Sequence, residues 1–395
     1  MTTLHKIPRG VWMLGFVSMF MDISSELIHG LLPVFMVTVL GASMLSVGII
    51  EGIAESVALI VKVFSGVISD WLGRRKGLTV LGYGLSALSK PAFALATTVS
   101  AAFLARFVDR IGKGIRGAPR DALVADMVPP GMRGAAFGLR QSLDTVGAFT
   151  GPALAVVLML VFAGDFRLVF WFATIPACLA VALLIAGVHE PVTDRPRTAI
   201  LPPIRWSSLK LFSNAYWWVV CIGGFFTLAR FSEAFLILRA QQAGLSNSLA
   251  PVVLIVMNII YALSAYPAGK LADRINRKHL LIAGLLLLII ADLILARADS
   301  LTMVFTGVML WGLHMGMTQG LLAAMIADSA PENLRGTAYG FFNLVSGVAL
   351  LFASVIAGAL WDVYGAGMTF YVGAGIAGFT LLLLIRRDRN NRFIQ

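Results

Sequence analysis

The chain has 395 residues, of which 58% are hydrophobic and only 13% are charged. A mean hydropathy of +0.87 excludes an ordinary soluble domain and predicts a polytopic membrane protein built from spans of about 20 residues. The formal net charge of +11 is typical of a membrane protein with basic cytoplasmic loops, so it does not indicate a nucleic-acid partner.

Apolar runs separated by Gly, Pro, Asn and charge clusters predict twelve membrane spans. The spans cover residues 11–38, 46–68, 77–97, 100–120, 134–162, 167–188, 215–238, 249–270, 279–297, 301–326, 336–361 and 368–386. The first run contains acidic residues and lacks a short apolar region followed by a cleavage site. We therefore expect a first span rather than a removed signal.

Spans one and two each carry acidic residues on a single helix face. Asp22, Glu26 and His29 stand at i, i+4 and i+7, and Glu51 and Glu55 stand at i and i+4. Because acids inside a membrane are functional by default, these four carboxylates are the predicted proton carriers. His29 beside two acids also admits a divalent metal, but the nearby Arg and Lys residues would repel a bare cation, so no metal site is predicted.

The fourth span carries seven charges on one helix face. They are Arg106, Asp109, Arg110, Lys113, Arg116, Arg120 and Asp121. At about 100° per residue they fall within an arc of about 140°. One Arg or Lys at the bilayer centre costs at least about 2.5–3.5 kcal/mol, so this face is expected to look into a bundle interior or a watered cavity. Salt bridges that only fix helix packing are the alternative for some of these residues.

A helix rise of about 1.5 Å per residue predicts two ionic layers in the first half. The outer layer holds Glu26, Glu51 and Arg106, and the deeper layer holds Asp22, Glu55, Asp109 and Arg110. A carboxylate that shares a layer with arginine can exchange partners and protons, so we expect Arg106 and Arg110 to be the partners of these acids.

The second half carries far fewer charges in its spans, namely Arg230, Glu233 and Asp292. We therefore expect the first half to provide ion coupling and polar recognition, and the second half to provide a more apolar wall. Asp292 and His314 are expected to make local hydrogen bonds. The residues predicted to bind the substrate are Arg110, Lys113, Asp109, His29, Asp144, Asn258 and Tyr261.

Residues 189–214 form a long polar, proline-rich interval that we interpret as a cytoplasmic linker. It divides an amino-terminal six-helix bundle, residues 1–188, from a carboxy-terminal six-helix bundle, residues 215–395. Most Lys and Arg residues outside the spans fall on the side of the two termini, and only Arg167, Arg239 and Arg297 fall on the other side. Basic loops favour the cytoplasm, so both termini are predicted to be cytoplasmic.

Two motifs of the first half return in the second half at nearly one offset. Gly66-x-x-x-Asp70-x-x-Gly73-Arg74-Arg75 returns as Gly269-x-x-x-Asp273-x-x-Asn276-Arg277-Lys278, 203 residues later. Ala125-Asp126 with Arg133-Gly134 returns as Ala327-Asp328 with Arg335-Gly336, 202 residues later. The duplication predicts an all-α membrane protein of twelve transmembrane helices in two pseudo-symmetric six-helix bundles, an architecture typical of transporters.

With these motifs the whole chain resembles the major facilitator superfamily. The stretch from Gly66 to Lys76 is similar to the family's motif between spans two and three, and Arg106 falls where the family keeps an arginine in span four. The resemblance implies a role for Arg106 in proton coupling and a conformational switch at the cytoplasmic helix ends. The switch residues would be Gly66, Asp70, Gly73, Arg74, Arg75, Asp273 and Arg277.

The sequence Gly147-x-x-x-Gly151-Pro152 in span five is similar to the motif associated with antiporters of this family. Gly and Pro remove side-chain bulk and a backbone donor, which allows a kink and a close helix approach. Gly151 and Pro152 are therefore expected at a moving helix interface. Ala155 and Val156 stand where the glycine pair that often follows this motif would be.

We predict a secondary active transporter that works by alternating access, most simply by proton-coupled export of a small organic solute. It would use the proton gradient and no cofactor, and act as a monomer in the lipid bilayer of the plasma membrane, by resemblance the bacterial inner membrane. No nucleophile constellation indicates an enzyme. Proton-coupled uptake of an organic anion or metal chelate, divalent-metal efflux, and a non-transporting membrane receptor are the alternatives.

Overall fold

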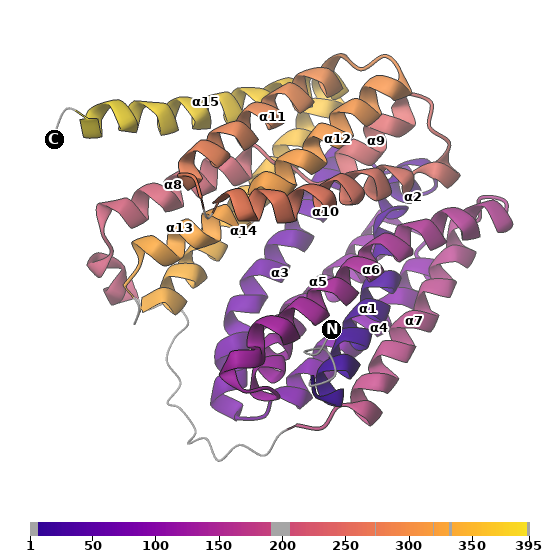
Figure 1. Cartoon of the computed structure of the whole chain (residues 1–395). Coiled ribbons are helices and arrows are strands. Elements are labelled where there is room, and N and C mark those ends of the chain that lie inside the picture. Colours follow the sequence, from indigo (N-terminus) through magenta and orange to yellow (C-terminus); the bar gives the residue numbers. More distant parts are fainter. Residues whose placement is uncertain (1–6, 191–205, 273, 319, 332–333, 393–395) are drawn as a thin grey trace. The chain divides into compact units, whose positions relative to one another are not determined.

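The computed structural model describes residues 7–190, 206–272, 274–318, 320–331 and 334–392, and this part of the chain is helical and contains no strand. The helices of the first half are α1 (Arg9–His29), α2 (Leu32–Thr38), α3 (Met44–Leu72), α4 (Arg75–Leu95), α5 (Val99–Asp126), α6 (Arg133–Val161) and α7 (Phe166–Gly187) (Figure 1). The helices of the second half are α8 (Asn214–Leu228), α9 (Ala234–Gln242), α10 (Val252–Ala272), α11 (Arg277–Arg297), α12 (Leu301–Thr318), α13 (Leu321–Ser329), α14 (Arg335–Tyr364) and α15 (Ala366–Arg392).

Each of the twelve predicted spans coincides with one helix or with two consecutive helices. Within the described ranges, nine helical segments are long and apolar enough to cross a membrane. The other three predicted spans correspond to α4, to α5 and to α8 with α9. α5 is long enough to span a bilayer, but the charges of its ionic face make it too polar to count as an apolar membrane helix.

Three predicted spans are interrupted in their second halves, and one of them is divided between α12 and α13. α1 ends at His29 and α2 begins at Leu32, next to Pro33, which lacks the N–H of a continuing helix. α8 ends at Leu228 and α9 begins at Ala234, so the predicted span over 215–238 consists of two helices. Residues 229–233 contain neither Gly nor Pro, and the sequence therefore offered no local signal for this break.

The chain divides into two compact units. Unit 1 contains residues 1–41 and 57–203, and unit 2 contains residues 42–56 and 204–395. The division along the chain falls inside the predicted linker, whose residues 191–205 lie outside the described part. The amino-terminal half of α3 groups with unit 2, because the Asp362 carboxylate accepts hydrogen bonds from the backbone N–H groups of Met44 and Leu45 at 3.0 and 2.8 Å.

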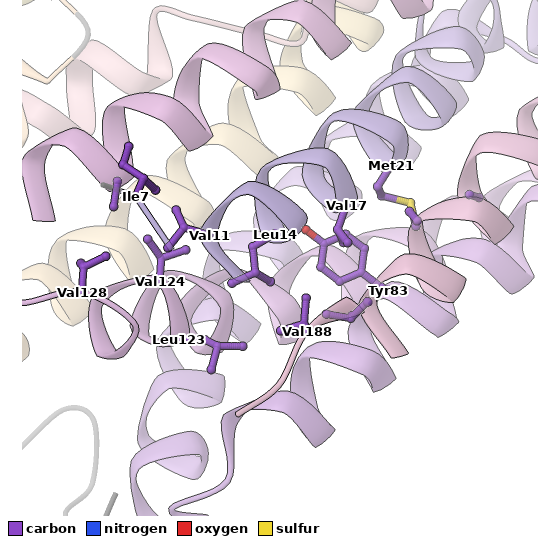
Figure 2. Close-up of a cluster of buried hydrophobic side chains, with 14 of the residues drawn as sticks. Ile7, Val11, Leu14, Val17, Met21, Tyr83, Leu123, Val124, Val128 and Val188 are labelled. Atoms are coloured by element: carbon purple, nitrogen blue, oxygen red, sulfur yellow. The ribbon is translucent and has the colours of Figure 1, made fainter. Parts of the chain in front are cut away.

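The apolar core of unit 1 is built on one face of α1. Val11, Leu14, Val17 and Met21 recur every three or four residues and are fully buried against α4, α5 and α7. Figure 2 shows the hydroxyl of Tyr83 pointing toward α1, where it lies 3.0 Å from the Ser18 hydroxyl. With this face buried in the core, Asp22 and Glu26 fall on the remaining surface of α1.

The packing within each unit repeats at the offset read from the sequence. Gly82 of α4 packs against Gly112 and Arg116 of α5, and Gly284 of α11 packs against His314 and Thr318 of α12, each residue 202 positions later. The ion pair Arg75–Asp126 returns in unit 2 as Arg277–Asp328 at the same offset. The duplicated sequence therefore forms duplicated helix contacts.

Candidate functional site

The two carboxylates of α1 lie at the closest approach of α1 and α6. A Cβ atom on Gly147 would lie 2.9 Å from the Asp22 Cβ and 2.7 Å from the Met19 carbonyl oxygen. A Cβ atom on Gly151 would lie 2.8 Å from the Glu26 Cβ. No side chain fits in these gaps, so the glycines allow the α6 backbone to rest on the two helical turns that carry the acids.

Asp22 belongs to a cluster of charges contributed by α1, α5 and α6. Its electrostatic neighbours are Asp144, which has the same charge, and the cations Arg116, Lys113 and Arg120. The half-buried position of Asp22 and the mixed signs around it mean that the cations are shared between carboxylates. When one acid gains or loses a proton, the electrostatic interaction of the shared cations with the other acid therefore changes as well.

A chain of ion pairs continues the cluster toward the amino-terminal end of α6. Arg140 pairs with Asp144 one turn along α6, and its Nε lies 3.8 Å from Asp121 on α5. Arg120 lies 3.0 Å from the Asp121 carboxylate and donates a hydrogen bond of 3.1 Å to Ser18 on α1. The chain thus ties α1, α5 and α6 together through polar groups.

Glu26 lies at the end of α1, just before the helix break. Its carboxylate is 3.5 Å from the His29 Nδ1, and Lys113 and Arg110 are its other charged neighbours. Both partners of the pair keep some exposure, 22% for Glu26 and 12% for His29, so neither side chain is fully buried. Interrupted helices supply polar backbone groups at the binding sites of many transporters, which makes this end of α1 a candidate site.

Lys90 and Asp109 form a sealed ion pair between α4 and α5. The Lys90 Nζ lies 2.9 Å from Asp109 Oδ1 and donates a hydrogen bond of 3.1 Å to the Ser25 hydroxyl. Arg110 Nε lies 3.6 Å from the other oxygen. The side chains are 1% and 3% exposed, so the structure places Asp109, predicted to bind substrate, inside a packing contact.

The remaining predicted residues of the ionic face differ in exposure. Arg106 and Arg110 are buried at 1% and 2%, whereas Lys113 is exposed. Glu51 is buried and Glu55 half-buried on the part of α3 that groups with unit 2. The structure therefore brings together Asp22, Glu26, His29, Lys113 and Asp144 in unit 1, while the two acids of α3 belong to the other unit.

Asn258 and Tyr261 lie on α10 in unit 2, and both are half-buried. Two glycines of α12 face this stretch, since a Cβ on Gly312 would contact the Met257 carbonyl and a Cβ on Gly316 would contact the Tyr261 carbonyl. Arg230 lies in the break between α8 and α9, and its guanidinium carbon is 5.7 Å from the centre of the Phe226 ring. Tyr261 is close enough to Arg230 to interact with it electrostatically. This polar group of unit 2 is small, as predicted.

Two predicted switch residues of unit 1 meet between the end of α3 and the start of α4. Arg75 lies 3.1 Å from Asp70 and 2.7 Å from Asp126. Gly73 has a φ of +62°, a conformation that suits glycine in the tight turn between α3 and α4. In the second copy Asn276 has a φ of −60°, and its side chain accepts a hydrogen bond of 3.0 Å from the Lys278 N–H instead. Asp273 lies outside the described residues.

Gly66 packs near Ala118 of α5, and Arg74 is the residue immediately before α4. Sequence reasoning missed Glu190, whose carboxylate accepts hydrogen bonds from the Arg75 and Lys76 N–H groups at the start of α4. A carboxylate at a helix amino terminus is favourable, but nothing in the residues around Glu190 identifies its partner helix. Among the described residues, no group of three His, Cys, Asp or Glu side chains is arranged to hold a metal ion.

Comparisons with known proteins agree along the length of the chain. The family model described as Major Facilitator Superfamily matches residues 14–257 and 233–393. An uncharacterized MFS-type transporter of Methanocaldococcus jannaschii is 33% identical, over 96% of this chain and 95% of the relative. The multidrug resistance protein MdtH of Cronobacter sakazakii is 26% identical, over 92% of this chain and 88% of the relative.

Solved structures share the fold at low sequence identity. A variant of the nucleoside transporter NupG has a TM-score of 0.79 and 12% identity, covering 95% of this chain and 99% of that one. A POT family transporter in complex with 5-aminolevulinic acid has a TM-score of 0.77 and 14% identity, covering 96% of both chains. At this level of identity the likeness concerns the fold alone.

Proposed function

Because the chain belongs to the major facilitator superfamily and is therefore a multi-pass membrane transporter, we propose that it exports a small organic solute in exchange for protons. The observation that carries this proposal is the contact of Gly147 and Gly151 with the turns of α1 that bear Asp22 and Glu26. Proton-binding groups thereby lie at a helix interface that can move.

The chemistry of the cluster supports proton coupling. Arg116, Lys113 and Arg120 surround Asp22, and Arg120 also interacts with Asp144, so a proton that binds one carboxylate frees a cation for another partner. In this proposal, cargo that competes for those cations releases the proton, and the proton in turn displaces the cargo. Exchange of the two ligands at a shared set of groups is the basis of antiport.

The glycine contact supports a link between protonation and movement. Neutralising Asp22 or Glu26 alters the forces on α1 at the points where the α6 backbone touches it. Since Gly147 and Gly151 leave no side chain between the helices, a small shift of α1 changes the packing of α6 directly. We propose that this shift contributes to alternating access, with Gly66, Asp70, Gly73, Arg74, Arg75, Asp273, Arg277 and Pro152 acting in the conformational switch.

Export is favoured over uptake by the resemblance of the Gly147 to Pro152 motif to that of antiporters and by the multidrug resistance relative. Uptake of an organic anion is the second candidate, because the exposed Lys113 and its neighbours Arg110 and Arg116 suit a carboxylate or phosphate group. We further propose a monomer in the bacterial inner membrane with both termini in the cytoplasm, driven by the proton gradient without a cofactor.

Transport by purified protein in liposomes tests the proposal. The probes are ethidium, a permanent organic cation, and sulforhodamine B, an organic anion; a growth screen of a deletion strain against drugs, metals and organic acids adds further candidates. An exchanger accumulates its probe when the lumen is acidic, whereas a symporter accumulates it when the lumen is alkaline. Protein-free liposomes give the passive background.

Two variants connect the transport to the site. Asp22→Asn and Glu26→Gln should abolish accumulation driven by the pH gradient while the protein keeps its fold. Asp299→Asn, which changes an exposed acid between α11 and α12, is the matched control and should transport like the wild type. Unchanged transport by both site variants would refute the assignment of these acids.

A further inference from the structure

Asp292 of α11 is a fully buried carboxylate in unit 2. Its exposure is 0%, and neither carboxylate oxygen has a hydrogen-bond partner among the residues that the structure describes. The expectation that Asp292 makes a local hydrogen bond is therefore wrong, whereas His314 does lie 2.7 Å from the Gly284 carbonyl oxygen. A buried polar group without a partner is rare enough in native proteins to require an explanation.

The carboxylate lies where α11, α15 and the break between α8 and α9 meet. A Cβ atom on Gly373 of α15 would lie 2.8 Å from Asp292 Oδ2, 3.1 Å from a ring carbon of Phe231 and 3.6 Å from the Ala229 carbonyl oxygen. Phe231 and Ala229 belong to the interrupted segment between the two helices. The absence of a side chain at Gly373 thus leaves just enough room for the carboxylate beside this segment.

The charged and titratable side chains on the surrounding elements are engaged elsewhere. Arg297 donates to the Tyr371 hydroxyl, Arg239 donates to the Leu295 and Ala298 carbonyls, Arg230 lies over Phe226, and His314 binds the Gly284 carbonyl. No ion pair joins any of them to Asp292 in the described part of unit 2. The carboxylate therefore lacks a counter-charge from α9, α12, α15 or the break.

Unit 1 provides an internal comparison for this position. Asp292 stands 202 residues after Lys90, the same offset that relates Gly82 to Gly284 and their packing partners. In unit 1 the buried Lys90 is neutralised by Asp109, whereas the residue 202 positions after Asp109 is Trp311, a buried and uncharged side chain. The repeat has thus placed a charged residue at the same point of both units but supplied a partner in only one.

An ionised carboxylate in such surroundings would be strongly destabilising, and groups in this situation neutralise instead. A metal cation would need several oxygen ligands and space, yet each Asp292 oxygen has less than 1 Å² of accessible surface. The smallest cation, a proton, needs neither. We infer that Asp292 is a proton-binding site of unit 2 that exchanges with water when the segment carrying Phe231 moves.

This inference deepens the proposed function, since it adds a second proton site to the carboxylates of α1. The interrupted helix gives it a route to water, because residues 230–232 make no i to i−4 backbone hydrogen bond and the Ser232 N–H donates instead to the Ser354 hydroxyl at 3.3 Å. Phe231 is only 6% exposed and packs against Trp311 and Phe370 at ring distances of 5.3 and 5.4 Å. Movement of this ring would open the site.

Infrared difference spectroscopy of the full chain in lipid tests the inference without knowledge of the substrate. At neutral pH the wild type should show the carbonyl stretching band of a protonated carboxyl group, and Asp292→Asn should lack that component. Asp299→Asn is the matched control, because it removes an exposed acid by the same substitution and should leave the band unchanged.

A second measurement uses the rate at which this band shifts after transfer to heavy water. Phe231→Ala should exchange at least severalfold faster than the wild type, since it removes the ring that covers the carboxyl group. A wild type without a protonated carboxyl band at neutral pH, or a band that persists in Asp292→Asn, would overturn the inference even if Asp292→Asn folded poorly. Loss of proton coupling in Asp22→Asn is a separate result, so the two proposals can fail independently.

Discussion

The sealed pair Lys90–Asp109 allows a quantitative prediction about stability. Lys90→Met keeps a long apolar side chain but removes the cation 2.9 Å from a carboxylate that is 3% exposed. Removing one partner of a buried ion pair costs about 3–5 kcal/mol because the other charge remains uncompensated. Arg110 still lies 3.6 Å from the same carboxylate, so we expect the lower end, about 3 kcal/mol.

For a cooperative unit of about 200 residues, 1 kcal/mol corresponds to about 2–4 °C, so Lys90→Met should lower the unfolding temperature by about 6–12 °C. Thermal unfolding of the detergent-purified protein, followed by circular dichroism, measures this shift. The double variant Lys90→Met with Asp109→Leu removes both charges and should recover most of the loss, because apolar replacement of a whole buried pair is near neutral. A single variant that unfolds at the wild-type temperature would refute the reasoning.

Two further predictions concern other contacts. Gly151→Leu should lower transport and reduce the free energy of unfolding by about 1–3 kcal/mol, because it forces a side chain against α1. Gly138→Leu, on the same helix, is the control: its side chain meets open space, so it should match the wild type in transport and unfolding assays. Glu190→Gln should reduce the free energy of unfolding by about 1 kcal/mol, because it removes the negative charge that accepts hydrogen bonds from the Arg75 and Lys76 N–H groups at the start of α4. The unfolding temperature should fall accordingly, and an unchanged unfolding temperature would exclude this role of Glu190.

The twelve spans and the internal repeat were predictable because both rest on periodic composition. The motif at Ala125-Asp126 and its second copy give an offset of 202 residues, and the structure repeats this offset in the ion pairs Arg75–Asp126 and Arg277–Asp328. The break of the first span near Pro33 was not predicted, although proline chemistry could have indicated it. The break at residues 229–233 was not predicted either, since it depends on tertiary packing.

The partners within the ionic face could not be predicted from spacing. Arg110 shares the deeper predicted layer with Asp109, but this depth does not indicate that Lys90, on another span, is the cation that pairs with Asp109. The answer depends on the close packing of α4 on α5, where Gly82 brings the two backbones together. Likewise, sequence identified Asp292 as a charge inside a span but not as one without a counter-charge, because that depends on side chains from four other segments.

The proximity of Gly147 and Gly151 to the two acids of α1 was also beyond the sequence. The antiporter-like motif predicted a close helix approach but not the helix that it approaches. The structure supplies that partner as α1, at the turns of Asp22 and Glu26. The site therefore connects two features, an acidic stripe and a glycine motif, that the sequence presents more than one hundred residues apart.

The most direct test of the account is whether protons move when cargo moves. Liposomes that contain the purified protein and a trapped pH-sensitive dye report proton flux when a transported probe is added on one side. The account predicts proton movement opposite to the probe in the wild type and none with Glu26→Gln. Probe transport by the wild type with no accompanying proton flux, or an unchanged proton flux in Glu26→Gln, would contradict it.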